Sequence, residues 1–163
     1  MADCDTDYDM LAAQIKALLG DESDALANTA NMVALVWQGM PHINWAGVYV
    51  LRGNELVLGP FQGNPACVRI PLGKGVCGTA AAERRTLRVA DVHDFPGHIA
   101  CDAASRSELV VPLICAGELL GVFDIDSPLA ARFSARDEQG MERLCAEFSA
   151  QLQRDGAPRK PFI

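Results

Sequence analysis

Residues 44–61 read NWAGVYVLRGNELVLGPF, and this stretch decides the fold class. Two apolar runs rich in valine, leucine and tyrosine flank Gly53-Asn54, a pair that turns easily because glycine and asparagine tolerate a positive φ. Residues with β-branched or aromatic side chains, bounded by turn residues, favour extended strands. We therefore predict a β-hairpin whose turn lies at residues 53–54.

A second hairpin is predicted at residues 109–126, LVVPLICAGELLGVFDID, with its turn at Ala116-Gly117. Pro112 has no backbone N–H, so its strand should lack a hydrogen-bonded neighbour on one side at that point. The chain shows no regular alternation of strand and helix, as a parallel α/β sheet would require. The order of elements therefore predicts an α+β fold with a central antiparallel sheet covered by helices.

Three segments carry apolar residues at helical spacing. Their predicted buried faces are Leu11, Ile15, Leu18 and Leu19 in residues 8–19; Leu26, Ala30, Val33 and Trp37 in residues 26–39; and Met141, Leu144, Cys145, Phe148 and Leu152 in the last helix. Gly20 is a candidate C-terminal cap of the first helix, and Ser134 a candidate N-cap of the last. These faces should pack on the sheet.

Residues 62–108 are mostly connection, rich in glycine and proline, with a short helical piece at residues 77–84 and a short strand at residues 86–91. A connection of this length inside a compact domain is usually functional. The chain shows no repeat and no linker. We expect a flexible N-terminus at residues 1–7, a single domain at residues 8–154 and a tail at residues 155–163.

The charge balance limits the partners of the protein. With 14 Lys+Arg against 21 Asp+Glu, the formal net charge is −7, so the chain repels phosphate backbones and anionic lipid. No apolar run approaches the roughly 18 residues that span a membrane, and the acidic start MADCDTDYDM is unlike a secretory signal. We expect a cytoplasmic protein that binds neither nucleic acid nor membrane.

Six cysteines in a reducing compartment suggest buried thiols, redox chemistry or a metal site rather than a disulfide framework. Cys115 and Cys145 occupy apolar patterns typical of small core residues, and Cys4 lies in the acidic terminus. The glycine-rich connection carries the other three, Cys67, Cys77 and Cys101. Their spacing alone leaves three readings open: redox thiols, incidental thiols, or zinc ligands completed by His98.

Two acids and two aromatics share the faces of predicted strands. Asp124 and Asp126 lie at i and i+2, so they point to the same side, and Glu108 begins the partner strand. These acids are either solvated strand ends or a three-carboxylate cluster in which at least one pKa is raised. Trp45 and Tyr49 also share a face, with Gly47 leaving space between them. The aromatics are either core residues or the wall of a pocket for a small amine.

Three segments, PACVRIPLGKGVCGTAA, GHIACDAASRSE and GVFDIDSP, make the chain resemble the free methionine-R-sulfoxide reductases, a branch of the GAF domain superfamily. The resemblance covers about residues 8–152. It implies a six-stranded antiparallel sheet, a pocket closed by a long loop, free methionine (R)-sulfoxide as substrate and thioredoxin as external reductant. It places the family cysteines at Cys67, Cys77 and Cys101. The pocket aromatics fall on Trp45 and Tyr49, and the pocket acids on Glu108, Asp124 and Asp126.

For this chemistry we expect Cys101 to be the nucleophile, with Arg106 as a candidate stabiliser of its thiolate. Cys67 is the first choice for the resolving thiol and Cys77 the second, although Cys77 as nucleophile stays open. Glu108 is expected to donate to the sulfoxide oxygen beside Asp126, while Asp124 holds the ammonium group. These two roles are interchangeable.

We expect no bound cofactor and no metal, and the oligomeric state, with a homodimer among the alternatives, is open. The competing function is a GAF sensor domain that binds a small molecule without turnover.

Overall fold

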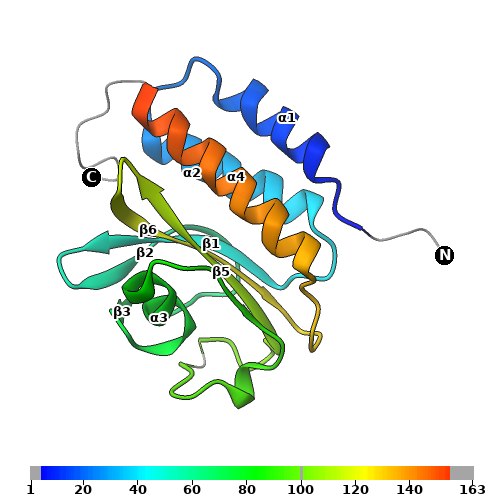
Figure 1. Ribbon diagram of the computed structural model, residues 1–163. Helices are drawn as coiled ribbons and strands as arrows, with labels where there is room; N and C mark the ends of the chain where they lie inside the picture. The colour runs from blue at the N-terminus through cyan, green and yellow to red at the C-terminus, as the bar shows by residue number, and fades with distance from the viewer. Residues whose placement is uncertain (1–4, 100, 155–163) are drawn as a thin grey trace.

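The computed structural model describes residues 5–99 and 101–154 and folds them around one six-stranded antiparallel sheet with helices on both faces (Figure 1). The strands are β1 (Trp45–Arg52), β2 (Glu55–Gly63), β3 (Arg69–Pro71), β4 (Leu87–Val89), β5 (Ser107–Cys115) and β6 (Glu118–Ser127). The helices are α1 (Tyr8–Leu19), α2 (Ala25–Gly39), α3 (Gly75–Glu83), α4 (Ala135–Arg154) and a single 3₁₀ turn, η1 (Val92–Asp94). The α+β class with a central antiparallel sheet is confirmed.

Both predicted hairpins form, and they meet at the centre of the sheet in the order β3-β2-β1-β6-β5-β4. Strand β4 pairs with β5 only at residues 108–110, so Pro112 has β6 as its sole strand neighbour in the described sheet, as predicted. The outer strand β3 has no apolar alternation, and the strand signals of the sequence did not predict it. It forms by pairing Leu56 of β2 with Ile70.

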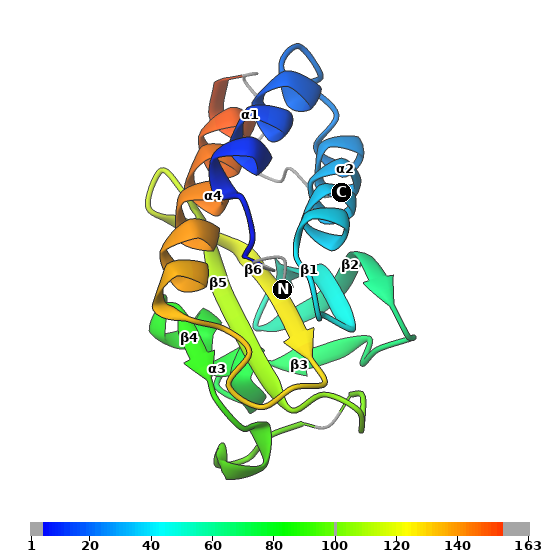
Figure 2. The same ribbon diagram turned by 90° about the vertical axis from the view of Figure 1, so that its right-hand side faces the viewer.

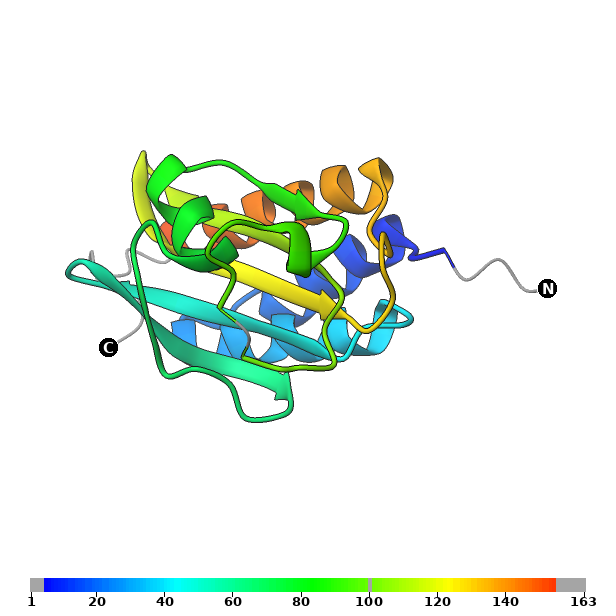
Figure 3. The ribbon, with the colours of Figure 1, turned by 90° about the horizontal axis from the view of Figure 1, so that it is seen from below.

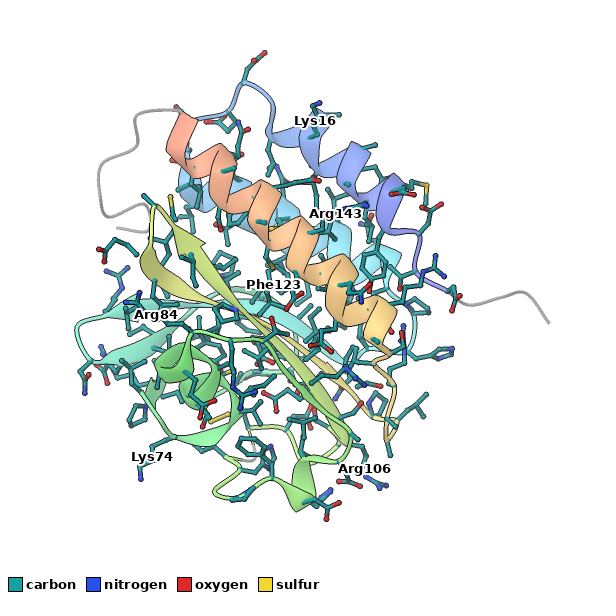
Figure 4. All side chains as sticks on the ribbon, in the orientation of Figure 1. Lys16, Lys74, Arg84, Arg106, Phe123 and Arg143 are labelled. Atoms are coloured by element: carbon teal, nitrogen blue, oxygen red, sulfur yellow. A yellow bond between two sulfur atoms is a disulfide. The ribbon has the colours of Figure 1, made fainter. Side chains whose placement is uncertain are left out.

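Three helices cover one face of the sheet. Helices α2 and α4 contact the strands, and α1 lies across both of them on the outer side (Figure 2). Successive residues of a strand point to opposite faces, so Val48 and Phe123 face these helices and are fully buried. Figure 4 shows Phe123 between the sheet and α4. This side of the sheet is the main hydrophobic core.

The buried face of α4 is the predicted one, since Met141, Leu144, Cys145, Phe148 and Leu152 all join this core. Its N-terminus is capped reciprocally. The Asp137 N–H donates to Ser134 Oγ at 3.2 Å, and the Ser134 N–H donates to Asp137 Oδ2 at 2.8 Å. Such an exchange satisfies backbone donors that the first turn leaves free. The predicted cap at Ser134 is confirmed.

The predicted faces of the first two helices were partly wrong. Leu18 and Leu26 are exposed, as is Ala30, and Trp37 is only half-buried. The buried residues of α2 are Ala25, Asn28, Thr29, Met32, Val33 and Val36. Asn28 and Thr29 enter the core because their side chains donate to the backbone oxygens of Glu22 and Ala25. With apolar residues on more than one stripe, the periodicity of α2 did not single out one face.

The chain ends are only partly described. Residues 1–4, which include Cys4, and the predicted tail at residues 155–163 lie outside the described residues. Within the predicted N-terminal segment, Asp5 is 2.7 Å from Arg136, Thr6 is buried and Asp7 caps α1. No helix in the described part of the chain combines the length and apolarity needed to cross a bilayer.

The opposite face of the sheet carries the smaller layer. Helix α3 and the connection from β4 to β5 lie against it, as Figure 3 shows from that side. Trp45, Tyr49 and Val122 of the sheet pack here with Val76 and Cys77 of α3. The pocket described below is formed between this face, α3 and the connection.

Candidate active site

Strand register brings the predicted acids and aromatics together on the α3 side of the sheet. Trp45 of β1 pairs with Asp126 of β6, which pairs on its other side with Glu108 of β5. Two residues along, Asp124 lies opposite Gly47. Residues paired across antiparallel strands point to the same face. The predicted three-carboxylate cluster therefore forms.

These side chains line a pocket of about 40 Å³ between the sheet, α3 and the β4–β5 connection. The sheet contributes Trp45, Tyr49, Glu108, Asp124 and Asp126; the segment before and within α3 contributes Pro65, Ala66, Ile70, Lys74, Gly75, Val76 and Cys77; and the connection contributes His98, Ile99, Cys101, Asp102 and Ser105. A space of this size holds on the order of three water molecules.

A disulfide joins Cys67 to Cys101, with Cα atoms 5.5 Å apart and a sequence separation of 34. It ties the segment after β2 to the β4–β5 connection, and Cys101 lines the pocket. Both cysteines are half-buried. The bond uses two of the thiols in the zinc set considered above, Cys67, Cys77, Cys101 and His98, so that set does not form in this state.

Cys77 is a free thiol on α3, 4 % exposed, and it faces the acids. Its Sγ lies 3.8 Å from Glu108 Oε1 as a hydrogen-bonded pair. One ligand-type atom from each of Cys77, Glu108 and Asp124 lies within 4.8 Å of the other two. His98 adds its Nε2 at 4.0 Å from Glu108 Oε2. The sequence did not predict this contact between Cys77 and the carboxylates.

Burial controls the protonation of this cluster. It raises the pKa of Glu108 well above its usual range, and the charges of Asp124 and Asp126 raise it further. The same penalty raises the pKa of Asp126 and brings that of Asp124 to about 6. The Cys77 thiol also has a raised pKa, because burial is reinforced by Asp124 and Glu108. The cluster therefore holds protons near neutral pH and favours any cation that enters it.

The aromatic side chains of the pocket wall stack on one another and leave no space between them. The Trp45 ring lies 5.8 Å from Tyr49 and 5.4 Å from Phe61, measured between centroids, at small interplanar angles. The space that Gly47 was predicted to leave is occupied by this indole: a Cβ at Gly47 would lie 2.4 Å from Trp45 Cη2. Glycine is required here so that the indole can lie flat over the strand.

Hydrogen bonds connect this wall to the disulfide segment. Tyr49 Oη donates to the Cys67 carbonyl at 2.9 Å, and Trp45 Nε1 donates to the Asn64 carbonyl at 3.1 Å. The segment carrying Cys67 is therefore held directly by the aromatic side chains of β1.

The connection around Cys101 is held by residues that sequence reasoning missed. Asp102 Oδ2 accepts from Asn44 at 3.4 Å and from Asn64 at 3.2 Å. Asn44 Nδ2 also donates to Ser105 Oγ at 3.1 Å. A pair of asparagines, one before β1 and one after β2, carried no signal of a shared partner 38 or 58 residues away.

Arg106 does not take its expected position. Its guanidinium pairs with Asp91 at 2.6 Å, and it is not among the described residues that line the pocket. In Figure 4 its side chain points outward from the lower edge of the domain. The predicted contact between Arg106 and the Cys101 thiolate is therefore absent from this state.

The glycine-rich turn before α3 is a second feature for which the sequence alone predicted no role. Gly75 has φ +62°, a left-handed conformation that glycine adopts at low cost, and a Cβ there would press on Ile99 of the connection. Gly75 and Val76 begin α3 and line the pocket. First-turn N–H groups have no partner within a helix. The glycines of the sequence PLGKGVCG were the signal for this turn and for the start of the helix.

Comparison with known proteins agrees with this architecture. The family profile of the GAF domain matches residues 10–152. Protein YtsP of Bacillus subtilis is 53 % identical over 92 % of this chain and 93 % of its own. The free methionine-R-sulfoxide reductase of Escherichia coli is 51 % identical over 89 % of this chain and 88 % of its own. The structure of fRMsr of Staphylococcus aureus in complex with substrate superimposes with a TM-score of 0.87, at 51 % identity, covering 91 % and 97 % of the two chains.

Proposed function

Because this chain belongs to the GAF domain family, and within it to the free methionine-R-sulfoxide reductases, we propose that it reduces free L-methionine (R)-sulfoxide to methionine. One observation carries the proposal: the Cys67–Cys101 disulfide contributes Cys101 to the lining of a pocket that has an aromatic wall and three buried acids. A pocket with these groups suits an amine that carries a polar sulfur group.

In the proposed reaction the Cys101 thiolate attacks the sulfoxide sulfur. The oxygen takes up one proton and passes from the substrate sulfur to the Cys101 sulfur, so that methionine leaves and Cys101 becomes a sulfenic acid. The Cys67 thiol then attacks that sulfur, water leaves, and the Cys67–Cys101 disulfide forms. The sum is one sulfoxide and two thiols giving one thioether, one disulfide and one water. The observed pairing of these two cysteines is the product this sequence of steps requires.

The environment of Cys77 argues against it as the nucleophile. The attacking species is the thiolate, and burial beside Asp124 and Glu108 raises the Cys77 pKa and keeps it a thiol. Cys101 lies in the connection and is half-buried, so it is more accessible to substrate. We therefore assign Cys101 as nucleophile and Cys67 as resolving thiol.

Glu108 is the proposed proton donor to the sulfoxide oxygen, with Asp126 beside it, and Asp124 is the proposed ligand of the substrate ammonium. A carboxyl with a raised pKa remains protonated at neutral pH and can donate, which supports Glu108 in this role. Trp45 and Tyr49 would hold the thioether end. The first-turn N–H groups of α3, at Gly75 and Val76, suit the substrate carboxylate.

We propose that the connection moves when substrate enters. In the disulfide state Cys101, which lines the pocket, is bonded to Cys67, so the β4–β5 connection is tied to the segment after β2. We propose that reduction of Cys67–Cys101 frees the connection and opens the pocket. Thioredoxin is the proposed external reductant and the cytoplasm the proposed location, since a reducing compartment regenerates the thiols.

Single-turnover assays of cysteine variants test the proposal. Pre-reduced protein without recycling reductant is mixed with free methionine (R)-sulfoxide, and methionine release and thiol loss are counted. The wild type should lose about two thiols per turnover, Cys101→Ser should release no methionine, and Cys67→Ser should complete one turnover without recycling. Cys115→Ser, a half-buried thiol away from the pocket, is the control.

Two outcomes would contradict the assignment. Release of one methionine per protein by Cys101→Ser would transfer the nucleophile to another cysteine. Binding of the sulfoxide with no loss of thiols in the wild type would make the protein a GAF sensor domain rather than an enzyme. Comparing the R and S epimers, free and peptide-bound, then tests the substrate class.

A further inference from the structure

We propose that Cys77, Glu108 and Asp124, completed by His98, form a binding site for Zn²⁺ in the disulfide state of the protein. The site would inhibit the reductase and would not serve as its cofactor. It differs from a zinc site built on the three connection cysteines, because Cys67 and Cys101 are bonded to each other. The remaining ligands are a thiol, two carboxylates and an imidazole.

The donor atoms already lie near the distances a small ion requires. Zn²⁺ binds sulfur at about 2.3 Å and oxygen at about 2.0–2.2 Å, which in a tetrahedron separates two such ligands by about 3.6 Å. Cys77 Sγ and Glu108 Oε1 are 3.8 Å apart. Asp124 offers an atom within 4.8 Å of both, so only a small side-chain movement closes the set. His98 Nε2 lies 4.0 Å from the other carboxylate oxygen, Glu108 Oε2, and outside the group of mutually close atoms, so its side chain would move to become the fourth ligand.

An unpartnered oxygen gives independent support for a ligand here. Asp124 is 6 % exposed, and among the described residues its Oδ1 accepts no hydrogen bond. Asp124 is also one of the residues that line the pocket. A buried carboxylate oxygen without a partner is costly. A cation bound by the thiol and the two carboxylates would remove that cost.

The charge of the pocket favours a divalent ion. Asp126 adds a third carboxyl to the wall, and the described lining contains one lysine and no arginine. That lysine, Lys74, is exposed, and its side chain extends away from α3 at the edge of the molecule (Figure 4). Apart from His98, no basic side chain of the described lining therefore lies among the acids. A site of one thiolate, carboxylates and imidazole matches Zn²⁺ better than Ca²⁺ or Mg²⁺, which prefer oxygen ligands alone.

Occupancy would block the proposed chemistry. A bound ion would take the oxygens of Glu108 and Asp124 that are proposed to meet the sulfoxide and the ammonium. The disulfide form is already inactive by the proposed mechanism, so the ion would act after reduction, by occupying the pocket until it is removed.

The experiment measures binding directly, on the full chain with its disulfide intact. Metal-free protein is titrated with Zn²⁺ by calorimetry and with Cd²⁺ by ultraviolet absorption, where a thiolate–metal bond gives a charge-transfer band. We expect one ion per chain and a Cd²⁺ band. Cys77→Ser should lose the band, and both it and Glu108→Gln should bind Zn²⁺ at least about 10- to 100-fold more weakly. Cys115→Ser should bind like the wild type.

Three results would overturn the proposal: no binding by the wild type, a Cd²⁺ band that survives in Cys77→Ser, or equal Zn²⁺ affinity in Glu108→Gln. Far-ultraviolet circular dichroism confirms that each variant is folded. Because none of these measurements depends on turnover, absence of reductase activity would refute the proposed function without touching the metal site. A reduced enzyme that Zn²⁺ inhibits and a chelator restores would connect the two.

Discussion

The buried acids should lower the stability of the protein at neutral pH. Asp124→Asn, which removes one of these charges, should therefore be more stable than the wild type. The folded state raises the pKa of Asp124 from 3.8 to about 6 because the carboxyl is buried. The folded protein therefore binds this proton more tightly than the unfolded chain does. Stability should fall as pH rises from about 4 to about 6, and the full penalty should persist above that range.

The size of the penalty follows from the two pKa values. Each pH unit between them corresponds to about 1.4 kcal/mol, so ionised Asp124 costs about 3 kcal/mol at pH 8. Asp124→Asn removes the charge, keeps the shape and adds an N–H donor beside Glu108. For a chain of this length the gain corresponds to a Tm rise of about 6–12 °C at pH 8, shrinking toward zero near pH 4.

Thermal unfolding of the disulfide form, at several pH values between 4 and 8, measures this difference. Asp137→Asn is the matched control, for which we expect the opposite change in stability. Burial raises the pKa of Asp137, but hydrogen bonds from Ser134 and Tyr8 and the charge of Arg132 lower it overall. A lowered pKa contributes stability that is present above the unfolded value and lost as pH falls through the folded one. Asp137→Asn should therefore destabilise at pH 8, by about 1.5–3 kcal/mol.

The reasoning is refuted if Asp124→Asn melts at or below the wild-type temperature at pH 8, or if its advantage does not shrink toward pH 4. The same variant should lose activity although it gains stability. Removing a buried charge-assisted contact costs about 2–4 kcal/mol, so kcat/KM should fall roughly 30- to 1000-fold. Changes below about threefold for Asp124→Asn, Asp126→Asn and Glu108→Gln alike would disprove a working acid cluster.

Two predictions concern the aromatic wall. Trp45→Ala removes the stacking on Tyr49 and Phe61. Steady-state kinetics should show a rise in KM that is larger than the fall in kcat. Unfolding experiments should show that the free energy of unfolding falls by about 3–5 kcal/mol. An unchanged KM would remove Trp45 from the substrate site. Gly47→Ala places a Cβ 2.4 Å from the indole and 2.5 Å from Phe61 Cβ, so it should cost about 1–3 kcal/mol and alter the tryptophan fluorescence. A wild-type spectrum and Tm would show that the indole does not depend on that space.

Much of the site was predictable because its elements are local. The i, i+2 spacing of Asp124 and Asp126 fixes their common face wherever the strand lies, and the turns at Gly53-Asn54 and Ala116-Gly117 set both hairpins. Glu108 is the second residue of the strand that pairs with β6, so the pleat and the hairpin made a three-acid cluster one of two alternatives, beside solvated strand ends. The stripe on α4 was equally clear, since its other faces are charged.

Tertiary structure alone decided which thiols meet. Cys67 and Cys101 come together across 34 residues of connection, and nothing periodic in that segment specifies its path. The same path sends Arg106 to Asp91 and brings Cys77 against Glu108. Tertiary packing also decided which face of α2 is buried, because apolar residues lie on more than one side of this helix. The periodicity of a strand or helix follows from backbone geometry, so it can be read from residues that are neighbours in the sequence. The partners of a loop side chain depend instead on packing between segments that are far apart in the sequence.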